Sequence, residues 1–242
     1  MKLKFIIDKR YDLEMVYWIF KKDPVKLDWL AKNIKIDPDL IRKIQKKEKK
    51  ESIKFLNGLI DIKYRVLIPY IKKILKFYQK SWDEINKEFF KTVQKITGYS
   101  WKYKIYFCVL SPFHRGISSW GGNKIIRSWQ ENPYIMRKIT AHELLISHIF
   151  TIFERDFKKI NLTDKEKWAL AEISAWAITG LEEKMLKFWP WISEEERYPL
   201  SHNYPELYNL QKVLRAKYEK KKDFRKFLDK AIKIIKTNMK PE

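Results

Sequence analysis

The sequence predicts a predominantly helical α+β fold, in which a small β-sheet packs against helices. Three observations support this prediction. Apolar residues make up 45% of the 242 residues and aromatic residues 15%, which is enough material for a packed core. The chain has only 6 glycines and 9 prolines, which favours long regular elements over loops. Apolar residues recur at three- and four-residue steps over most of the chain, whereas three short stretches are rich in β-branched and aromatic residues.

The first part of the chain predicts one strand followed by helices. Residues 3–7, LKFII, predict the strand, and Asp12 is expected to cap a helix over DLEMVYWIF. KLDWLAKNI and DPDLIRKIQKKEKKESIKFLNGLI predict further helices. The helical spacing then continues from Tyr64 to about Ile96, and Gly98 ends it. Residues 1–97 are therefore expected to form a mainly helical N-terminal region.

The second part alternates between strand and helix signals. WKYKIYFCVLS and NKIIRSW predict two strands, separated by SPFHRGISSWGG, which has the composition of loops and turns. Pro133 begins a helix, NLTD at 161–164 predicts a turn and a helix cap, and DKEKWALAEISAWAITGLEEKMLKFW predicts the next helix. Two more helices, in YPELYNLQKVLRAKYEKK and DFRKFLDKAIKIIKTNM, complete a predicted α+β region over 98–242. A single continuous domain is the alternative.

The net charge indicates which kinds of partner the protein could attract. The net charge is +22, from 52 Lys and Arg against 30 Asp and Glu. Such a surface attracts nucleic acid, anionic membranes or acidic partners, although a merely solvated Lys-rich surface is the simpler interpretation. No stretch approaches the roughly 18 apolar residues of a membrane span. Cys108, the single cysteine, cannot form an internal disulfide, so we expect a reducing compartment and a cytoplasmic location.

The stretch ITAHELLISHIF, residues 139–150, carries the strongest chemical signal. It places His142 next to Glu143 on a predicted helix. In zinc proteases such a pair divides the work, because the His binds the metal and the Glu activates the metal-bound water. Glu172 lies in the next predicted helix among small and apolar residues, where burying an unpaired charge is costly. Its partner is a metal in one interpretation and a Lys or Arg in the other.

The order of strand, strand, HE helix, short loop and a helix with an isolated Glu resembles the zincin metallopeptidases, specifically their gluzincin branch. In that family an HExxH helix supplies two His ligands and the general base, and a Glu on a following helix is the third protein ligand. The resemblance implies that His142 is the first zinc ligand, Glu143 the general base and Glu172 the downstream ligand. It covers roughly residues 102–185.

The sequence departs from the family at the second ligand. The HExxH spacing would place that ligand on Ile146, but the next histidine is His148, and HELLISH is similar to the HExxxH variant of dipeptidyl-peptidase-III-type enzymes. In a regular helix His148 would lie about 120° around and about 9 Å along the axis from His142, too far to share one zinc. A wide turn between Leu144 and Ser147 would bring the two together, and we expect this bulged form. A regular helix with a degenerate site is the alternative.

Two other histidines are candidates for the same site. Gluzincins often place a His or Tyr downstream to stabilise the oxyanion, so the resemblance implies this catalytic role for His202, with Tyr204 or Tyr208 as alternatives. His114, in SPFHRG, could line the cleft, although a position on a loop surface is the simpler interpretation.

Two functional hypotheses follow. The first is a zinc-dependent peptidase in which His142, His148 and Glu172 hold zinc, and Glu143 takes a proton from a zinc-bound water that attacks a peptide or protein substrate. The second is a catalytically inactive zincin-like scaffold that binds a protein or nucleic-acid partner through its basic surface. The sequence contains no Gly-rich phosphate loop, nucleophile elbow or CxxC pair that would indicate another chemistry.

Overall fold

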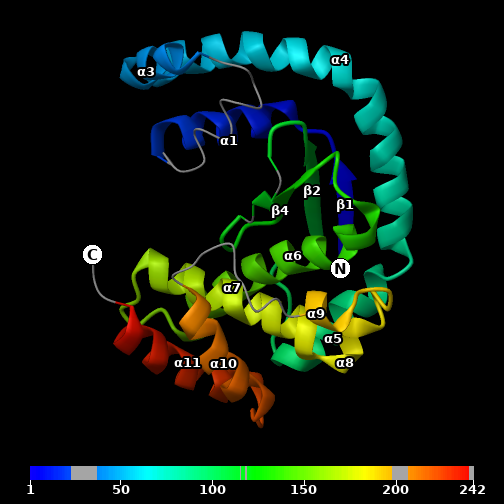
Figure 1. Ribbon diagram of the computed structural model, residues 1–242, viewed down its shortest axis with the longest axis vertical. Coiled ribbons are helices and arrows are strands. Elements are labelled where there is room, and N and C mark those ends of the chain that lie inside the picture. The colour runs from blue at the N-terminus through cyan, green and yellow to red at the C-terminus, as the bar shows by residue number, and fades with distance from the viewer. Residues whose placement is uncertain (23–36, 115, 118, 198–206, 240–242) are drawn as a thin grey trace.

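The computed structural model describes residues 1–22, 37–114, 116–117, 119–197 and 207–239 of the chain. The predicted fold class is confirmed, since a small sheet lies within a mainly helical α+β molecule (Figure 1). Helix α4 arches along the outside of the molecule, and helices α6 and α7 lie side by side beneath the sheet (Figure 1). The sequence stretch KLDWLAKNI lies outside the described residues.

The sheet has four strands in the order β1-β2-β4-β3. Strands β1 (Lys2–Ile6), β2 (Ile105–Ser111) and β4 (Lys124–Ser128) are parallel to one another, and β3 (Gly116–Ile117) pairs antiparallel with β4 at one edge. The three predicted strands are confirmed. Strand β3 lies in the stretch expected to be a loop, because two residues are too short to produce a periodic signal.

Side chains from two helices satisfy the backbone of β1 at the other edge of the sheet. Asn86 Oδ1 accepts the Leu3 N–H at 3.0 Å, and Gln79 Oε1 accepts the Phe5 N–H at 2.8 Å. An unpaired edge strand exposes backbone donors that could pair with another chain. The two amide side chains therefore close this edge and tie the N-terminal strand to the helical part of the molecule.

The N-terminal helices are α1 (Lys9–Lys22), α3 (Pro38–Lys46), α4 (Lys49–Asp83) and α5 (Asn86–Thr97). The prediction that Asp12 caps a helix is wrong, because α1 begins earlier and Asp8 accepts the Tyr11 N–H at 3.0 Å. Asp12 is instead fully buried and accepts a hydrogen bond from Tyr64 at 2.6 Å. Gly98 ends α5 with a φ of 75°, a left-handed conformation that favours glycine.

Local sequence also explains the two helices that carry the candidate site. Helix α6 (Pro133–Asp156) begins with Pro133 after Asn132, whose side chain accepts the Tyr134 N–H. Helix α7 (Asp164–Leu181) begins with a capping box, in which Thr163 and Glu166 satisfy each other's backbone N–H groups. This cap confirms the prediction made from NLTD. Both helices are buried along most of their length.

The remaining helices pack below α7. They are the short helices α8 (Glu183–Leu186) and α9 (Glu194–Arg197), followed by α10 (Tyr208–Glu219) and α11 (Phe224–Asn238). Within the described part of the chain, no helix is both long and apolar enough to cross a membrane.

The buried apolar residues form two clusters. The larger one joins β1, β2 and β4 to helices α5, α6 and α7 and to the C-terminal helices. The smaller one joins α1, α3 and the first half of α4 around Phe113. Strand β1 comes from the predicted N-terminal region but pairs with β2 from the predicted C-terminal region. The division at residue 97 therefore crosses a continuous sheet, and two separate domains stay a prediction.

Candidate functional site

The candidate site lies on α6, a continuous α-helix from Pro133 to Asp156. Every residue from Thr140 to Phe150 is buried, because the helix lies between the sheet and α7. The first turn of the HE motif meets the middle of α7, whose small residues Ala171 and Ala175 allow the two helices to approach closely. This packing brings groups that are far apart in the sequence into contact.

His142 and Glu172 meet across the α6–α7 interface. His142 Nε2 lies 3.2 Å from Glu172 Oε1, and the two side chains are 4% and 11% exposed. The imidazole also lies 4.5 Å, between ring centroids, from Trp176. His142 Nδ1 is buried and has no hydrogen-bond partner among the described residues. The predicted contact between His142 and Glu172 is present, while a role as metal ligands stays a prediction.

Lys138 lies near this pair and was missed by the sequence reasoning. It precedes His142 by one helical turn and is 2% exposed. Its ammonium lies 4.8 Å from the centroid of Trp176 and donates to the backbone carbonyl oxygens of Glu196 and Arg197. Burial lowers the pKa of Lys138 to about 8. Its four-residue spacing from His142 was the signal that could have found it.

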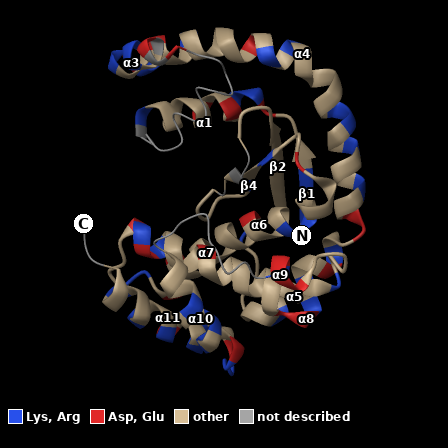
Figure 2. Cartoon of the chain, in the orientation of Figure 1, with Lys and Arg blue, Asp and Glu red and all other residues tan. Residues whose placement is uncertain are grey.

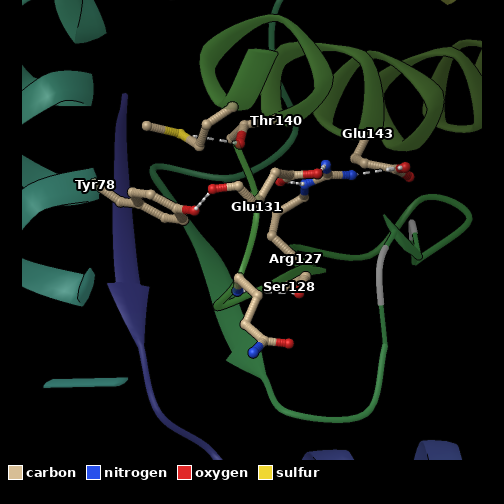
Figure 3. A network of polar contacts seen from close by, with 8 residues as sticks. Tyr78, Arg127, Ser128, Glu131, Thr140 and Glu143 are labelled. Atoms are coloured by element: carbon tan, nitrogen blue, oxygen red, sulfur yellow. Dashed lines mark hydrogen bonds and ion pairs between the residues drawn. The ribbon is translucent and has the colours of Figure 1, made fainter. Parts of the chain in front are cut away.

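Glu143 faces a different part of the molecule. Its Oε1 lies 3.5 Å from Nη1 of Arg127, a fully buried residue at the end of β4. Arg127 also forms an ion pair with Glu131, whose Oε2 accepts the Nε–H at 2.8 Å, and Tyr78 donates to the Glu131 carbonyl at 2.7 Å (Figure 3). Burial lowers the pKa of the Arg127 guanidinium. The expected general base thus belongs to an ion-pair network at the end of the sheet.

The expected bulge in α6 is wrong, because the helix keeps α-helical structure throughout the motif. Ile146 therefore occupies the position one turn after His142, and it is 3% exposed. His148 points to a different face, where its ring stacks on Trp101 at 4.3 Å and its Nε2 lies 3.3 Å from Thr97 Oγ1. Burial lowers the pKa of His148 to about 3. Helical packing against α5 and the chain after it explains this placement.

The other predicted residues do not join the pair. The expectation that His114 lies on a loop surface is wrong, because its side chain is 2% exposed and lies 3.7 Å from Asp12 in the smaller core. Tyr208 begins α10 and is 36% exposed. His202 and Tyr204 lie outside the described residues. Cys108 is buried, and burial raises the pKa of its thiol.

The His142–Glu172 pair has the geometry of two of the three protein ligands that a catalytic zinc ion needs. Two ligands of a tetrahedral zinc with bonds of about 2 Å lie about 3.3 Å apart, close to the 3.2 Å between Nε2 and Oε1. The second histidine of the motif is not in place, because Ile146 holds that position. Among residues with defined positions, no three His, Cys, Asp or Glu side chains gather around one point. Helix α6 therefore offers one candidate ligand, whereas the corresponding helix of the zincins has two.

Fold and site together define an α+β protein in which a buried pair, His142 and Glu172, joins helices α6 and α7. Comparison with known proteins gives no match to a family model, to a curated protein or to a solved structure.

Proposed function

We propose that this chain is a binding protein built on a zincin-like scaffold, and that an anionic partner attaches to its basic surface. The observation that carries the proposal is the regular course of α6, which leaves Ile146 in the second ligand position and His148 on another face. A catalytic zinc site uses three protein ligands and one position for water. A helix that supplies only His142 holds zinc weakly and supports little hydrolysis.

The groups around the motif agree with this proposal. Lys138 places a positive charge near Trp176, next to His142, where it would repel a metal cation. Glu143 is attracted by Arg127 on the side of the sheet, which competes with a role as a base toward water at His142. Both neighbours are buried, so water screens their charges little. The local electrostatics therefore favour a structural pair of helices over a metal centre.

The partner is inferred from charge. The chain carries +22, and Lys and Arg are spread over the outer faces of α4, α10 and α11 (Figure 2). A field of one sign steers anionic molecules to the surface and raises their rate of association. Nucleic acid, an acidic protein and an anionic membrane all have the required charge.

The test measures hydrolysis and anion binding on the same full-length protein. We expect no cleavage of a mixed peptide library with added zinc, and the same background for the parent, His142→Ala and Glu143→Gln. We also expect retention on a heparin column that weakens as salt rises. Cleavage that both substitutions abolish would refute the non-hydrolytic role, and elution without retention at low salt would refute the anionic partner.

A zinc-dependent peptidase is the second candidate, and the 3.2 Å separation of His142 Nε2 and Glu172 Oε1 is the observation that favours it. Strand β3 adds a structural reason, because an extended peptide can pair with a strand at the edge of a sheet. The segment after β3 is tied to α6, since Ser147 Oγ accepts the Ser119 N–H at 3.3 Å. Zinc analysis of protein purified without a metal-affinity tag tests this candidate. One bound zinc per chain, lost in both His142→Ala and Glu172→Ala, would favour it.

A further inference from the structure

Helix α4 has an apolar stripe on its outer face. The stripe consists of four large side chains that are each more than half exposed: Ile62 at 64%, Val66 at 62%, Tyr70 at 57% and Phe77 at 51%. At about 100° per residue these positions fall within about 80° of one another around the helix axis, and they extend about 22 Å along it. They share one face of the helix, on which the exposed Lys73 lies between Tyr70 and Phe77.

The stripe belongs to neither of the two buried clusters. The opposite face of α4 already contributes Ile60, Tyr64, Ile71 and Tyr78 to the two cores, and each of them is less than 5% exposed. The helix forms the outer rim of the molecule, with the sheet and α1 on its inner side (Figure 1). Isolated exposed apolar residues are common, but four on one helical face indicate an interaction site.

Along the length of the stripe the charged residues are all basic, and Asp61 and Asp83 lie just beyond its two ends. Between residues 62 and 82 the helix carries Lys63, Arg65, Lys72, Lys73, Lys76 and Lys80 and no Asp or Glu. Within the described structure, the last four of these form no ion pair with an acidic side chain, and all four are exposed. Lys and Arg recur along this helix in Figure 2. An occupant of this face must therefore combine negative charge with apolar groups.

We propose that the stripe on α4 docks the protein on an anionic lipid membrane surface. Such a surface supplies acyl chains for Ile62, Val66 and Phe77 and anionic headgroups for the lysines, whose long stems let the ammonium reach the headgroup level. Tyr70 suits the boundary, because its ring is apolar and its hydroxyl is polar. This proposal rests on the proposed function, of which it names the partner.

Lipid is favoured over the other anionic partners by the shape and chemistry of the face. The four side chains are each more than half exposed. Helix α4 arches along the outside of the molecule (Figure 1), where a soft and deformable phase can surround exposed groups. Phosphate groups of nucleic acid would meet the lysines but leave Ile62 and Val66 exposed to water. A partner protein would need an apolar groove with an acidic rim.

Vesicle binding by the full-length protein tests the proposal. We expect partition onto vesicles of phosphatidylcholine with one third phosphatidylglycerol at physiological salt, and little onto phosphatidylcholine alone. The double substitution V66S/F77S and the charge reversal K72E/K76E should each lower the partition coefficient at least about tenfold. Val213→Ser on the basic helix α10 is the matched control, since Val213 is 47% exposed, and it should bind as the parent does.

Insertion is measured with an environment-sensitive fluorophore attached at Val66→Cys. Cys108 is fully buried, so labelling is confined to the new thiol. The emission should shift to the blue on anionic vesicles, and the same label at Val213→Cys should not respond. Equal binding of V66S/F77S and the parent would mean that charge alone attracts the protein, and it would overturn the proposal.

A different occupant of the stripe would give a different experimental result. Light scattering that gives a dimer for the parent and a monomer for V66S/F77S would assign the stripe to a second copy of the chain. Retention on RNA that V66S/F77S weakens, without vesicle binding by the parent, would assign it to nucleic acid. Either result overturns the lipid proposal and leaves the proposed function intact, whereas peptide cleavage that depends on Glu143 refutes the proposed function and leaves vesicle binding unaffected.

Discussion

Replacing Ile146 by His restores the HExxH spacing and tests whether α6 and α7 form a zincin-like pair. The side chain at 146 lies on the same face of α6 as His142, about 6 Å further along the axis. Because Ile146 is 3% exposed, the substitution should lower the free energy of unfolding by about 2–4 kcal/mol without metal. With His142 and Glu172 already 3.2 Å apart, three ligands would then be available for one zinc.

The expected result is a new zinc site that recovers the lost stability. A ligand present at 100 times its Kd stabilises a folded protein by about 2.7 kcal/mol. Chemical denaturation of the variant with and without zinc should therefore show a gain of about this size, and elemental analysis should give one zinc per chain. The parent should gain far less, because its helix supplies a single histidine.

A matched control separates a built site from simple histidine affinity. Ile149→His puts the same group at another fully buried position of α6, two turns from His142, where it is too distant to share a zinc. It should lose stability without recovering it on addition of zinc. A zincin-like arrangement of α6 and α7 is ruled out if Ile146→His folds but binds no more zinc than the parent or the control, or if its zinc affinity survives Glu172→Ala.

Three further predictions concern buried ionisable groups. Burial disfavours the charged form of His148 and lowers its pKa to about 3, so below about pH 6.5 the unfolded chain binds a proton that the folded chain does not. The free energy of unfolding should therefore fall by about 2 kcal/mol between pH 7 and 5. His148→Phe should remove this loss, as urea titrations would measure. Burial raises the pKa of Asp12 to about 7, so the folded chain keeps a proton that the unfolded chain releases, and stability should fall by about 3 kcal/mol from pH 4 to 7 in the parent but not in Asp12→Asn. For either residue, if the difference in the free energy of unfolding between parent and variant does not change over the stated pH range, the shifted pKa is contradicted. Arg127→Met should lower the free energy of unfolding by about 3–5 kcal/mol, because it removes the cation that Glu131 and Glu143 share. Adding E131Q and E143Q should restore a large part of this stability, as thermal unfolding would measure. No recovery in the triple variant would mean that the packing of the Arg127 side chain dominates.

Local sequence was sufficient to predict most of the secondary structure. The Thr163–Glu166 capping box, the left-handed Gly98 and the apolar strands act over a few residues, so their signals can be read without knowing the fold. The contact between His142 and Glu172 followed from the resemblance to gluzincins, which assigns both residues to one site, whereas the buried position of Glu172 alone left its partner open between a metal and a Lys or Arg. Strand β3 was not predictable, since two residues form a strand only where a neighbouring strand is already in place.

Tertiary packing decided the chemistry of the motif. The letters HELLISH allowed both a bulged and a regular helix, and their difference in free energy depends on what surrounds each side chain. Trp101 and Thr97 provide a buried place for His148, which removes the reason for α6 to give up helical hydrogen bonds. Arg127 approaches Glu143 from a strand that the sequence does not link to it. Partners brought together by folding, rather than the spacing of the motif, determine what these residues can do.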